Sequence, residues 1–216
     1  MSGESAASRV VDSLRQRMLT GDIKPGARLS QSKLATDYGV SRIPVRDALQ
    51  TLAGEGLLDI GGTTAVVRPL SIAELQELYE LREAVEPTLT RIAVPNVGLA
   101  ELTTMTALAE LMEATQAPAE WLSANARFHA LVYTRGDRPR MIQLTEQLRR
   151  LTDRYLYLHV GVFGNIDHLH AEHRRILDAV RRGDANATAR LTRAHIATSH
   201  EFILHYLLDH EIMSTG

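Results

Sequence analysis

The chain has 216 residues, 44% of them hydrophobic, so it can bury a sizeable core and is long enough for two domains. It has no cysteine, which excludes a disulfide framework and a thiolate metal site. No apolar run is long enough to span a bilayer and no signal-peptide core is visible, so we expect a cytoplasmic protein. The formal net charge of −2 gives little support to DNA binding, although residues 1–70 hold 9 Lys and Arg against 7 Asp and Glu, and the remainder 15 against 19.

The N-terminal part of the chain is predicted to form a helix-turn-helix unit. A first helix, expected over about residues 8–20, packs behind it. Ser30 can cap a second helix, which ends where Gly39 allows a left-handed turn, and Ser41 can cap a third helix that stops at Gly56.

The third of these helices has two distinct faces. Its apolar residues fall on one face, whereas Arg42, Arg46 and Gln50 recur at i, i+4 on the other. Pro44 lies in the first turn, where it stiffens the end that a recognition helix inserts into a major groove. Arginine at that end can bond the O6 and N7 atoms of guanine bidentately. We therefore expect Ser41, Arg42, Pro44, Arg46 and Gln50 to contact DNA; the alternative is that the two arginines only form a solvated helix face.

A β-hairpin is predicted after the third helix. Two short strands at about residues 57–60 and 65–67 are joined through a glycine-rich turn. The hairpin would form a wing, and Gly62 at its tip would let the main chain approach the DNA backbone or minor groove.

From Ser71 onward all the patterns are helical. Ser71 and Glu74 have the spacing of a capping box, so a new helix and a new domain begin there. Helical patterns cover about residues 72–94, 99–115, 119–134, 139–160, 166–182 and 185–211, and Pro87 is expected to kink the first. We predict a mainly α chain, with an N-terminal winged helix-turn-helix domain (residues 1–70) and a C-terminal all-helical bundle of about six helices (residues 71–216).

Histidine is confined to the predicted helical domain, where all nine lie at or after His129. Gly183 and Asp184 predict a tight helical hairpin, with His173 about ten residues before it and His195 about eleven after it. At a rise of about 1.5 Å per residue, these two histidines lie at nearly the same height on antiparallel helices. They can therefore meet.

A metal site can be built on this pair. Asn125 and His129 are one helical turn apart on a shared face, so they can present an oxygen and an imidazole to the same point. Three neutral imidazoles and one oxygen suit zinc, nickel or another borderline divalent metal. Two alternatives stay open: the histidines form only a structural core, or His168, His170 and His173 form a rival cluster, which is less favourable because helical positions two apart face away from each other.

Both halves of the chain resemble parts of one family of bacterial transcription regulators. Roughly residues 8–70 resemble the winged helix-turn-helix of the GntR family, through the segment G-V-S-R-I-P-V-R-D-A-L-Q-T-L-A-G-E-G-L-L. Roughly residues 71–210 resemble the effector domain of its FadR branch, called FCD, through Leu78-Tyr79-Glu80-Leu81-Arg82, Asn125-x-x-Phe128-His129, Glu172-His173 and Ala194-His195-Ile196.

The resemblance implies roles for individual residues. In many members an acidic residue and three histidines hold a divalent metal at the floor of a pocket where small carboxylates bind, which implies a metal-binding role here for Asn125, His129, His173 and His195. Asn125 stands at the acidic position and retains an oxygen without the negative charge. Arg82 matches a recurring arginine that could face an effector carboxylate, although a salt bridge with Glu86 at i+4 is equally natural.

Together these features predict a DNA-binding regulator and not an enzyme. We expect a homodimeric repressor whose affinity for a near-palindromic operator is modulated by a small carboxylate effector. A metal-dependent hydrolase using the three histidines is the alternative from another class, and it is disfavoured because no H-E-x-x-H or comparable motif occurs near the ligands.

Overall fold

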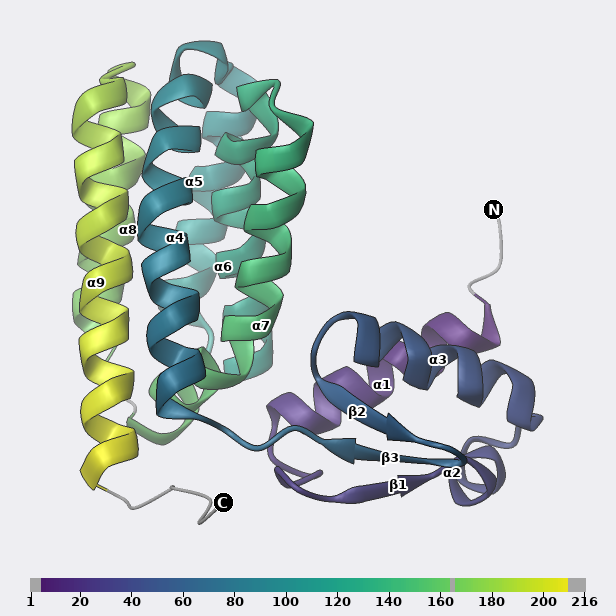
Figure 1. Ribbon diagram of the computed structural model, residues 1–216. Coiled ribbons are helices and arrows are strands. Elements are labelled where there is room, and N and C mark those ends of the chain that lie inside the picture. The colour runs from purple at the N-terminus through teal and green to yellow at the C-terminus, as the bar shows by residue number, and fades with distance from the viewer. Residues whose placement is uncertain (1–4, 164–165, 210–216) are drawn as a thin grey trace. The chain divides into compact units, whose positions relative to one another are not determined.

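The computed structural model describes residues 5–163 and 166–209, and within them no helix has the length and apolar character needed to cross a membrane. The chain is mainly helical and divides between Leu70 and Ser71 into two compact units (Figure 1).

The N-terminal unit combines three helices with a small sheet. In chain order these are α1 (Ala6–Leu19), β1 (Arg28–Ser30), α2 (Gln31–Tyr38), α3 (Arg42–Gly54), β2 (Leu58–Gly61) and β3 (Thr64–Val67). The antiparallel sheet has the order β1-β3-β2, so the predicted wing hairpin is confirmed and its second strand also pairs with β1. Strand β1 was not predicted, because three residues are too few to show a strand alternation.

The helix-turn-helix frame forms largely as predicted. The Ser30 hydroxyl accepts a hydrogen bond from the Lys33 N–H at 3.5 Å, and Gly39 ends α2 in the left-handed region with φ 63°. Ser41 occupies the N-cap position of α3, but the prediction that its side chain caps the helix was wrong. An N-cap oxygen usually accepts from the second or third N–H of the helix, and the third residue of α3 is Pro44, which has none.

The C-terminal unit is a bundle of six long helices: α4 (Ile72–Ala93), α5 (Leu99–Ala114), α6 (Pro118–Tyr133), α7 (Pro139–Phe163), α8 (Asp167–Arg181) and α9 (Ala185–Asp209). Short 3-10 turns follow α4 at Val94–Asn96 and α6 at Thr134–Gly136. Helix α4 continues through Pro87 and packs along α9 and α7, while α5 packs against α6 and α8. Trp121 and Phe128 of α6 lie in the apolar core with Leu169 of α8. The predicted end of the last helix, at residue 211, lies outside the described residues.

The start of α4 is hydrogen-bonded to α7. The Ser71 hydroxyl accepts from the Glu74 N–H at 3.3 Å, as predicted, but the Ser71 N–H donates to the hydroxyl of Tyr155 at 3.1 Å. That hydroxyl also contacts the Glu74 carboxylate at 2.7 Å. The reciprocal half of the predicted capping box is therefore replaced by Tyr155, because α7 brings a donor and acceptor to the same place.

The hairpin between α8 and α9 has the predicted chemistry. Gly183 adopts φ 66°, a left-handed conformation that glycine enters without steric cost. The Asp184 carboxylate accepts from the Ala187 N–H at 2.8 Å, which caps α9. This turn sets the antiparallel register of the two helices.

Candidate DNA interface and candidate metal centre

Helix α3 presents a buried face and an exposed face. Its apolar face is buried in the core of the N-terminal unit, at Val45, Ala48, Leu49 and Leu52. Arg42, Arg46 and Gln50 are exposed, and Pro44 is half-buried. Arg46 meets Asp47 at 3.3 Å with 56% of its side chain exposed, a contact weak enough for the guanidinium to turn to another partner. The predicted contact residues thus share one solvent-facing surface with Ser41.

The tip of the wing is hydrogen-bonded to the start of α2. Gly62 is exposed and adopts φ 62°. Next to it, the Thr63 carbonyl accepts from the Gln31 N–H at 3.2 Å. The glycine turn therefore has a fixed position relative to the helix-turn-helix.

Ile43 is a candidate contact residue that sequence reasoning missed. It lies between Arg42 and Pro44 and is 63% exposed, although isoleucine is among the residues most often buried. A signal was present, because Ile43 falls outside the apolar face formed by Val45 and Leu49. An exposed aliphatic side chain in the first turn of a recognition helix can pack against the methyl group of thymine.

The three predicted histidine ligands converge inside the helical bundle. His129 comes from α6, His173 from α8 and His195 from α9, and each is at most 6% exposed. Each offers a ring nitrogen, and these atoms all lie within 4.8 Å of one another. Asn125, one turn before His129, places Oδ1 at 2.9 Å from Nε2 of His173. We call the three imidazoles the histidine cluster.

The spacing of the cluster fits a divalent metal. Two nitrogens bound at about 2.0–2.1 Å to one tetrahedral zinc lie about 3.3–3.4 Å apart. The Nε2 atoms of His129 and His173 are separated by 3.3 Å. In His195, Nδ1 contacts the Glu172 carboxylate at 2.7 Å, which leaves Nε2 as the free donor atom. A carboxylate behind a metal-bound imidazole is a common arrangement that fixes its tautomer and orientation.

Burial favours the neutral form, which a metal requires, in two members of the cluster. It lowers the pKa of His129 well below its usual range, and the charge of Arg149 and the neighbouring histidines act in the same direction. Burial also lowers the pKa of His173, again aided by His195 and Arg149, against a smaller opposing effect of the Leu169 backbone. Neutral imidazoles release no proton on binding a cation, which favours metal binding at neutral pH.

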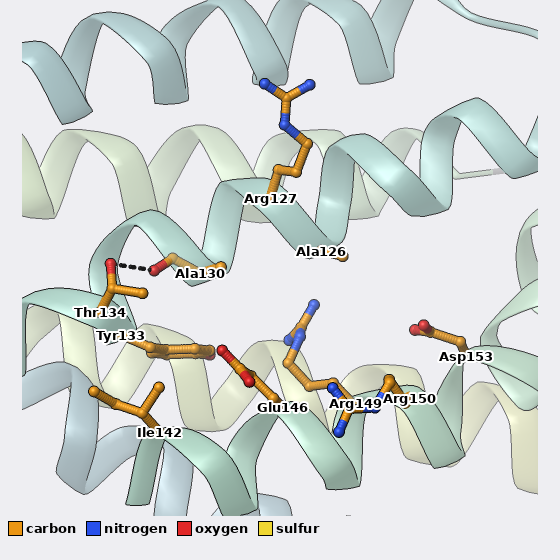
Figure 2. A pocket seen from close by; sticks show the side chains of 10 residues that line it. All are labelled: Ala126, Arg127, Ala130, Tyr133, Thr134, Ile142, Glu146, Arg149, Arg150 and Asp153. Atoms are coloured by element: carbon orange, nitrogen blue, oxygen red, sulfur yellow. Dashed lines mark hydrogen bonds between the residues drawn. The ribbon is translucent and has the colours of Figure 1, made fainter. Parts of the chain in front are cut away.

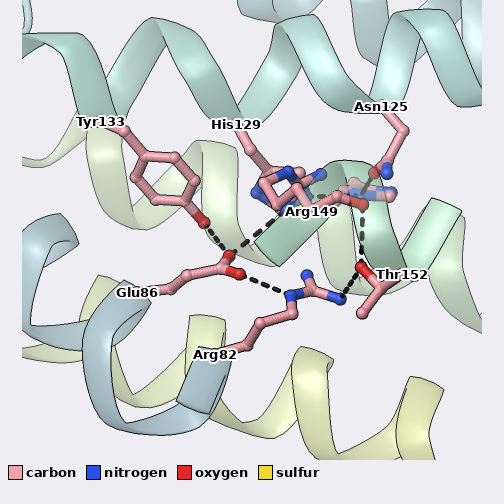
Figure 3. Close-up of polar contacts among 8 residues, drawn as sticks. Arg82, Glu86, Asn125, His129, Tyr133, Arg149 and Thr152 are labelled. Atoms are coloured by element: carbon pink, nitrogen blue, oxygen red, sulfur yellow. Dashed lines mark hydrogen bonds and ion pairs between the residues drawn. The ribbon is translucent and has the colours of Figure 1, made fainter. Parts of the chain in front are cut away.

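Arg82 forms the salt bridge that the sequence left open as an alternative to an effector contact. Its Nε donates to Glu86 at 2.5 Å and its Nη1 to the Thr152 hydroxyl at 3.2 Å (Figure 3). Glu86 is fully buried and also accepts from the hydroxyl of Tyr133 at 2.6 Å and from Arg149 at 3.3 Å. Burial alone would raise the pKa of Glu86, but Arg82 and Arg149 lower it, so the carboxylate stays ionised.

The rival histidine cluster is not assembled. His170 accepts from the indole N–H of Trp121 at 3.3 Å, and His168 stacks on Phe202 with ring centroids 5.0 Å apart. Of the predicted trio, only His173 belongs to a group of three possible ligands within reach of one ion, among the residues that the structure describes.

Comparison with known proteins places this architecture in a family. Residues 6–67 match the model described as bacterial regulatory proteins, gntR family, and residues 77–198 match the FCD domain. The chain belongs to the GntR family of regulators that carry an FCD domain. The predicted resemblance is confirmed, and so is the prediction that the chain is not an enzyme, because the family and its relatives are transcription regulators.

Relatives of this GntR-family chain align over different shares of its length. The HTH-type transcriptional regulator YdhC of Bacillus subtilis is 25% identical over 199 residues, covering 90% of this chain and 89% of the relative. McbR of Escherichia coli is 28% identical over 148 residues, 67% of each chain. The gluconate operon transcriptional repressor of Bacillus licheniformis is 40% identical over 86 residues, which are 40% of this chain and 35% of the relative.

Solved structures have the same fold. A structure of E. coli McbR/YncC superposes with a TM-score of 0.79 over 96% of this chain and 99% of its own, at 23% identity. A GntR regulator from Rhodococcus sp. RHA1 gives a TM-score of 0.77 over 94% of this chain and 99% of its own, also at 23% identity.

Proposed function

We propose that this GntR-family regulator is a cytoplasmic homodimeric repressor that binds a near-palindromic operator and responds to a small carboxylate. In this proposal α3 enters the major groove, and the effector binds in a pocket floored by a metal ion. Repression, rather than activation, of transcription is supported by relatives named as repressors. They include the gluconate operon repressor and E. coli GlaR, which is 25% identical over 197 residues.

The DNA-binding part of the proposal rests on the exposed face of α3. Arg42 and Arg46 lie at its N-terminal end, where a recognition helix meets base edges, and Gln50 continues the same face. One such unit makes few phosphate contacts, and the N-terminal residues carry little net charge. Two copies on adjacent half-sites would double the contacts, which supports a dimer as the binding species.

The effector part rests on one observation, the convergence of three buried imidazoles with Asn125. His129, His173 and His195 would hold zinc or nickel, with Asn125 as an oxygen ligand, and the ion would orient an anionic ligand. None of these four side chains is negatively charged. A carboxylate effector would therefore supply the charge that neutralises the ion.

Arg82 has one donor group left for the effector. Its Nε and Nη1 are used by Glu86 and Thr152, and among the described residues no hydrogen bond uses Nη2, which Figure 3 shows on the side that faces His129. An effector carboxylate bound by the metal could accept from Nη2 without disturbing the salt bridge to Glu86.

The first test is the metal content of the purified protein, measured by plasma mass spectrometry. We expect about one metal per chain in the wild type, loss of the metal in His195→Ala, and retention in His205→Ala, a matched control because His205 is exposed on the same helix α9. Wild-type protein that holds neither zinc nor nickel after incubation with each would refute the metal part of the proposal.

The second test measures operator binding. DNA selected from a random pool by the wild-type protein is titrated, by fluorescence anisotropy, with metal-loaded and chelator-treated protein and a panel of small carboxylates. We expect one carboxylate to change the affinity roughly 5–150-fold, and only in the metal-loaded form. Sedimentation of the complex reports whether two chains bind one site; one chain per operator would contradict the dimer.

A further inference from the structure

A cavity lies between α6 and α7, outside the histidine cluster. Its volume is about 240 Å³. Figure 2 shows α6 residues on one side of it and α7 residues on the other. Neither Asn125 nor any member of the histidine cluster lines it. We call it the α6–α7 cavity.

Arg149 gives this cavity a buried positive charge. Its side chain is 10% exposed and lines the cavity, and its one ion pair among the described residues is the 3.3 Å contact with Glu86. Glu86 is held more closely by Arg82 at 2.5 Å and by Tyr133 at 2.6 Å. One carboxylate therefore serves two buried arginines, and Arg149 makes the longer of the two contacts and donates one side-chain hydrogen bond among the described residues.

The other walls of the cavity are mainly apolar. Ala126 and Ala130 of α6 leave space opposite Ile142 of α7, and the ring of Tyr133 closes one side. The other charged residues at the cavity are Arg127, Arg150 and Glu146, which are exposed, and Asp153, which is half-buried, so water screens their charges. Arg127 extends away from the α7 side chains in Figure 2. The buried charge that lines the cavity is that of Arg149.

We propose that the α6–α7 cavity binds a compact organic monoanion, with its carboxylate on Arg149 and an apolar body between the two alanines and Ile142. The volume lies below the roughly 300–1,000 Å³ of drug-sized ligand pockets, which selects a small ligand. A carboxylate on a buried guanidinium forms charge-assisted hydrogen bonds, whereas a second negative charge would meet apolar walls.

This site is physically connected to the buried ion-pair network. An anion on Arg149 competes with Glu86 for the same guanidinium, and Glu86 in turn holds Arg82 and Tyr133. Any change that the anion causes in this network is reciprocal, so a ligand at the histidine cluster and an anion in the α6–α7 cavity alter each other's affinity by the same factor.

The test uses benzoate as the probe and its neutral isostere benzamide as the comparison, in calorimetric titrations of the full chain. We expect benzoate to bind with one site per chain and benzamide to bind at least tenfold more weakly. Absence of benzoate binding at millimolar concentration, or equal binding of the two compounds, would overturn the proposal.

Variants locate the site without disturbing the ion pairs. Ala130→Leu fills the cavity and is expected to weaken benzoate binding at least tenfold, while Ala100→Leu, an exposed alanine on α5, is the matched control and should leave it unchanged. His173→Ala should also leave benzoate affinity within a few fold. Benzoate binding that survives Ala130→Leu but is lost in His173→Ala would place the probe in the histidine cluster and refute the α6–α7 site.

Discussion

Replacing Glu86 by Gln removes the negative charge at the centre of the buried network. Glu86 is fully buried, and three donors converge on its carboxylate, from Arg82, Arg149 and Tyr133. Glutamine keeps the shape and one acceptor oxygen, but it leaves two buried guanidinium groups without a counter-charge. Glu86→Gln therefore isolates the electrostatic part of the network.

The expected loss of stability is large. Removing one partner of a buried ion pair costs about 3–5 kcal/mol, and the retained amide oxygen places this variant near the lower value. For a protein of this size each kcal/mol shifts the melting temperature by about 2–4 °C, so we expect a decrease of roughly 6–12 °C.

Trp121 provides a specific assay for this effect. It is the one tryptophan in the sequence and is 1% exposed in the core of the helical unit, so urea unfolding followed by its fluorescence reports on that unit alone.

Arg82→Met, made in the wild type and in Glu86→Gln, completes a double-mutant cycle. If the penalty comes from unpaired charge, Arg82→Met should be less costly in the variant. A penalty below about 1 kcal/mol, or additive effects within about 0.5 kcal/mol, would refute the reasoning.

The same substitution changes the pH dependence of stability. The folded pKa of Glu86 is lowered, so between the folded and unfolded values the unfolded chain binds more protons and stability rises with pH. The contribution of Glu86 is complete above its unfolded pKa of about 4.3 and is lost as the pH falls through the lower folded value. The difference in unfolding free energy between wild type and Glu86→Gln should therefore become smaller below about pH 4. A difference that stays constant with pH would contradict the predicted direction of this pH dependence.

Four further predictions address the two candidate sites. Arg46→Ala should weaken binding to the selected operator by about 1–3 kcal/mol, with the loss depending on one base pair in single-substitution operators; an equal loss on every sequence would mean a phosphate contact. Ile43→Ala should abolish the difference between thymine and deoxyuridine at one operator position, and a difference that persists argues against a methyl contact. Glu172→Gln should lower zinc affinity roughly 10–100-fold in chelator competition, whereas unchanged affinity would remove its role in orienting His195. Asn125→Asp should raise zinc affinity, because it adds a charged ligand; no gain would exclude Asn125 from the ligand set.

The sequence predicted those features that depend on local pattern. Gly183 and Asp184 specify a tight helical hairpin by themselves, and the fixed rise of a helix then brings His173 and His195 to one level. Asn125 and His129 share a face for the same reason. The two faces of α3 follow from its apolar periodicity. The meeting of His173 with His195 was therefore derivable before any helix was packed, whereas the placing of His129 beside them rested on the family resemblance.

Features that depend on packing between distant helices were not predictable. Glu86 was paired with Arg82 from i+4 spacing, but its contacts with Tyr133 and Arg149 arise only when α6 and α7 pack beside α4. The α6–α7 cavity likewise results from small side chains at Ala126 and Ala130 facing another helix, and no local pattern marks such a gap.

The attachment of Ser71 to Tyr155 has a mechanical consequence. Strand β3 ends at Val67, so only three residues separate the wing from the point where Tyr155 holds the main chain of Ser71. Tyr155 lies on α7, six residues after Arg149 and three after Thr152. The connecting segment therefore limits the distance between the Cα atoms of Val67 and Ser71 to at most about 14 Å, the length of four fully extended steps of the chain.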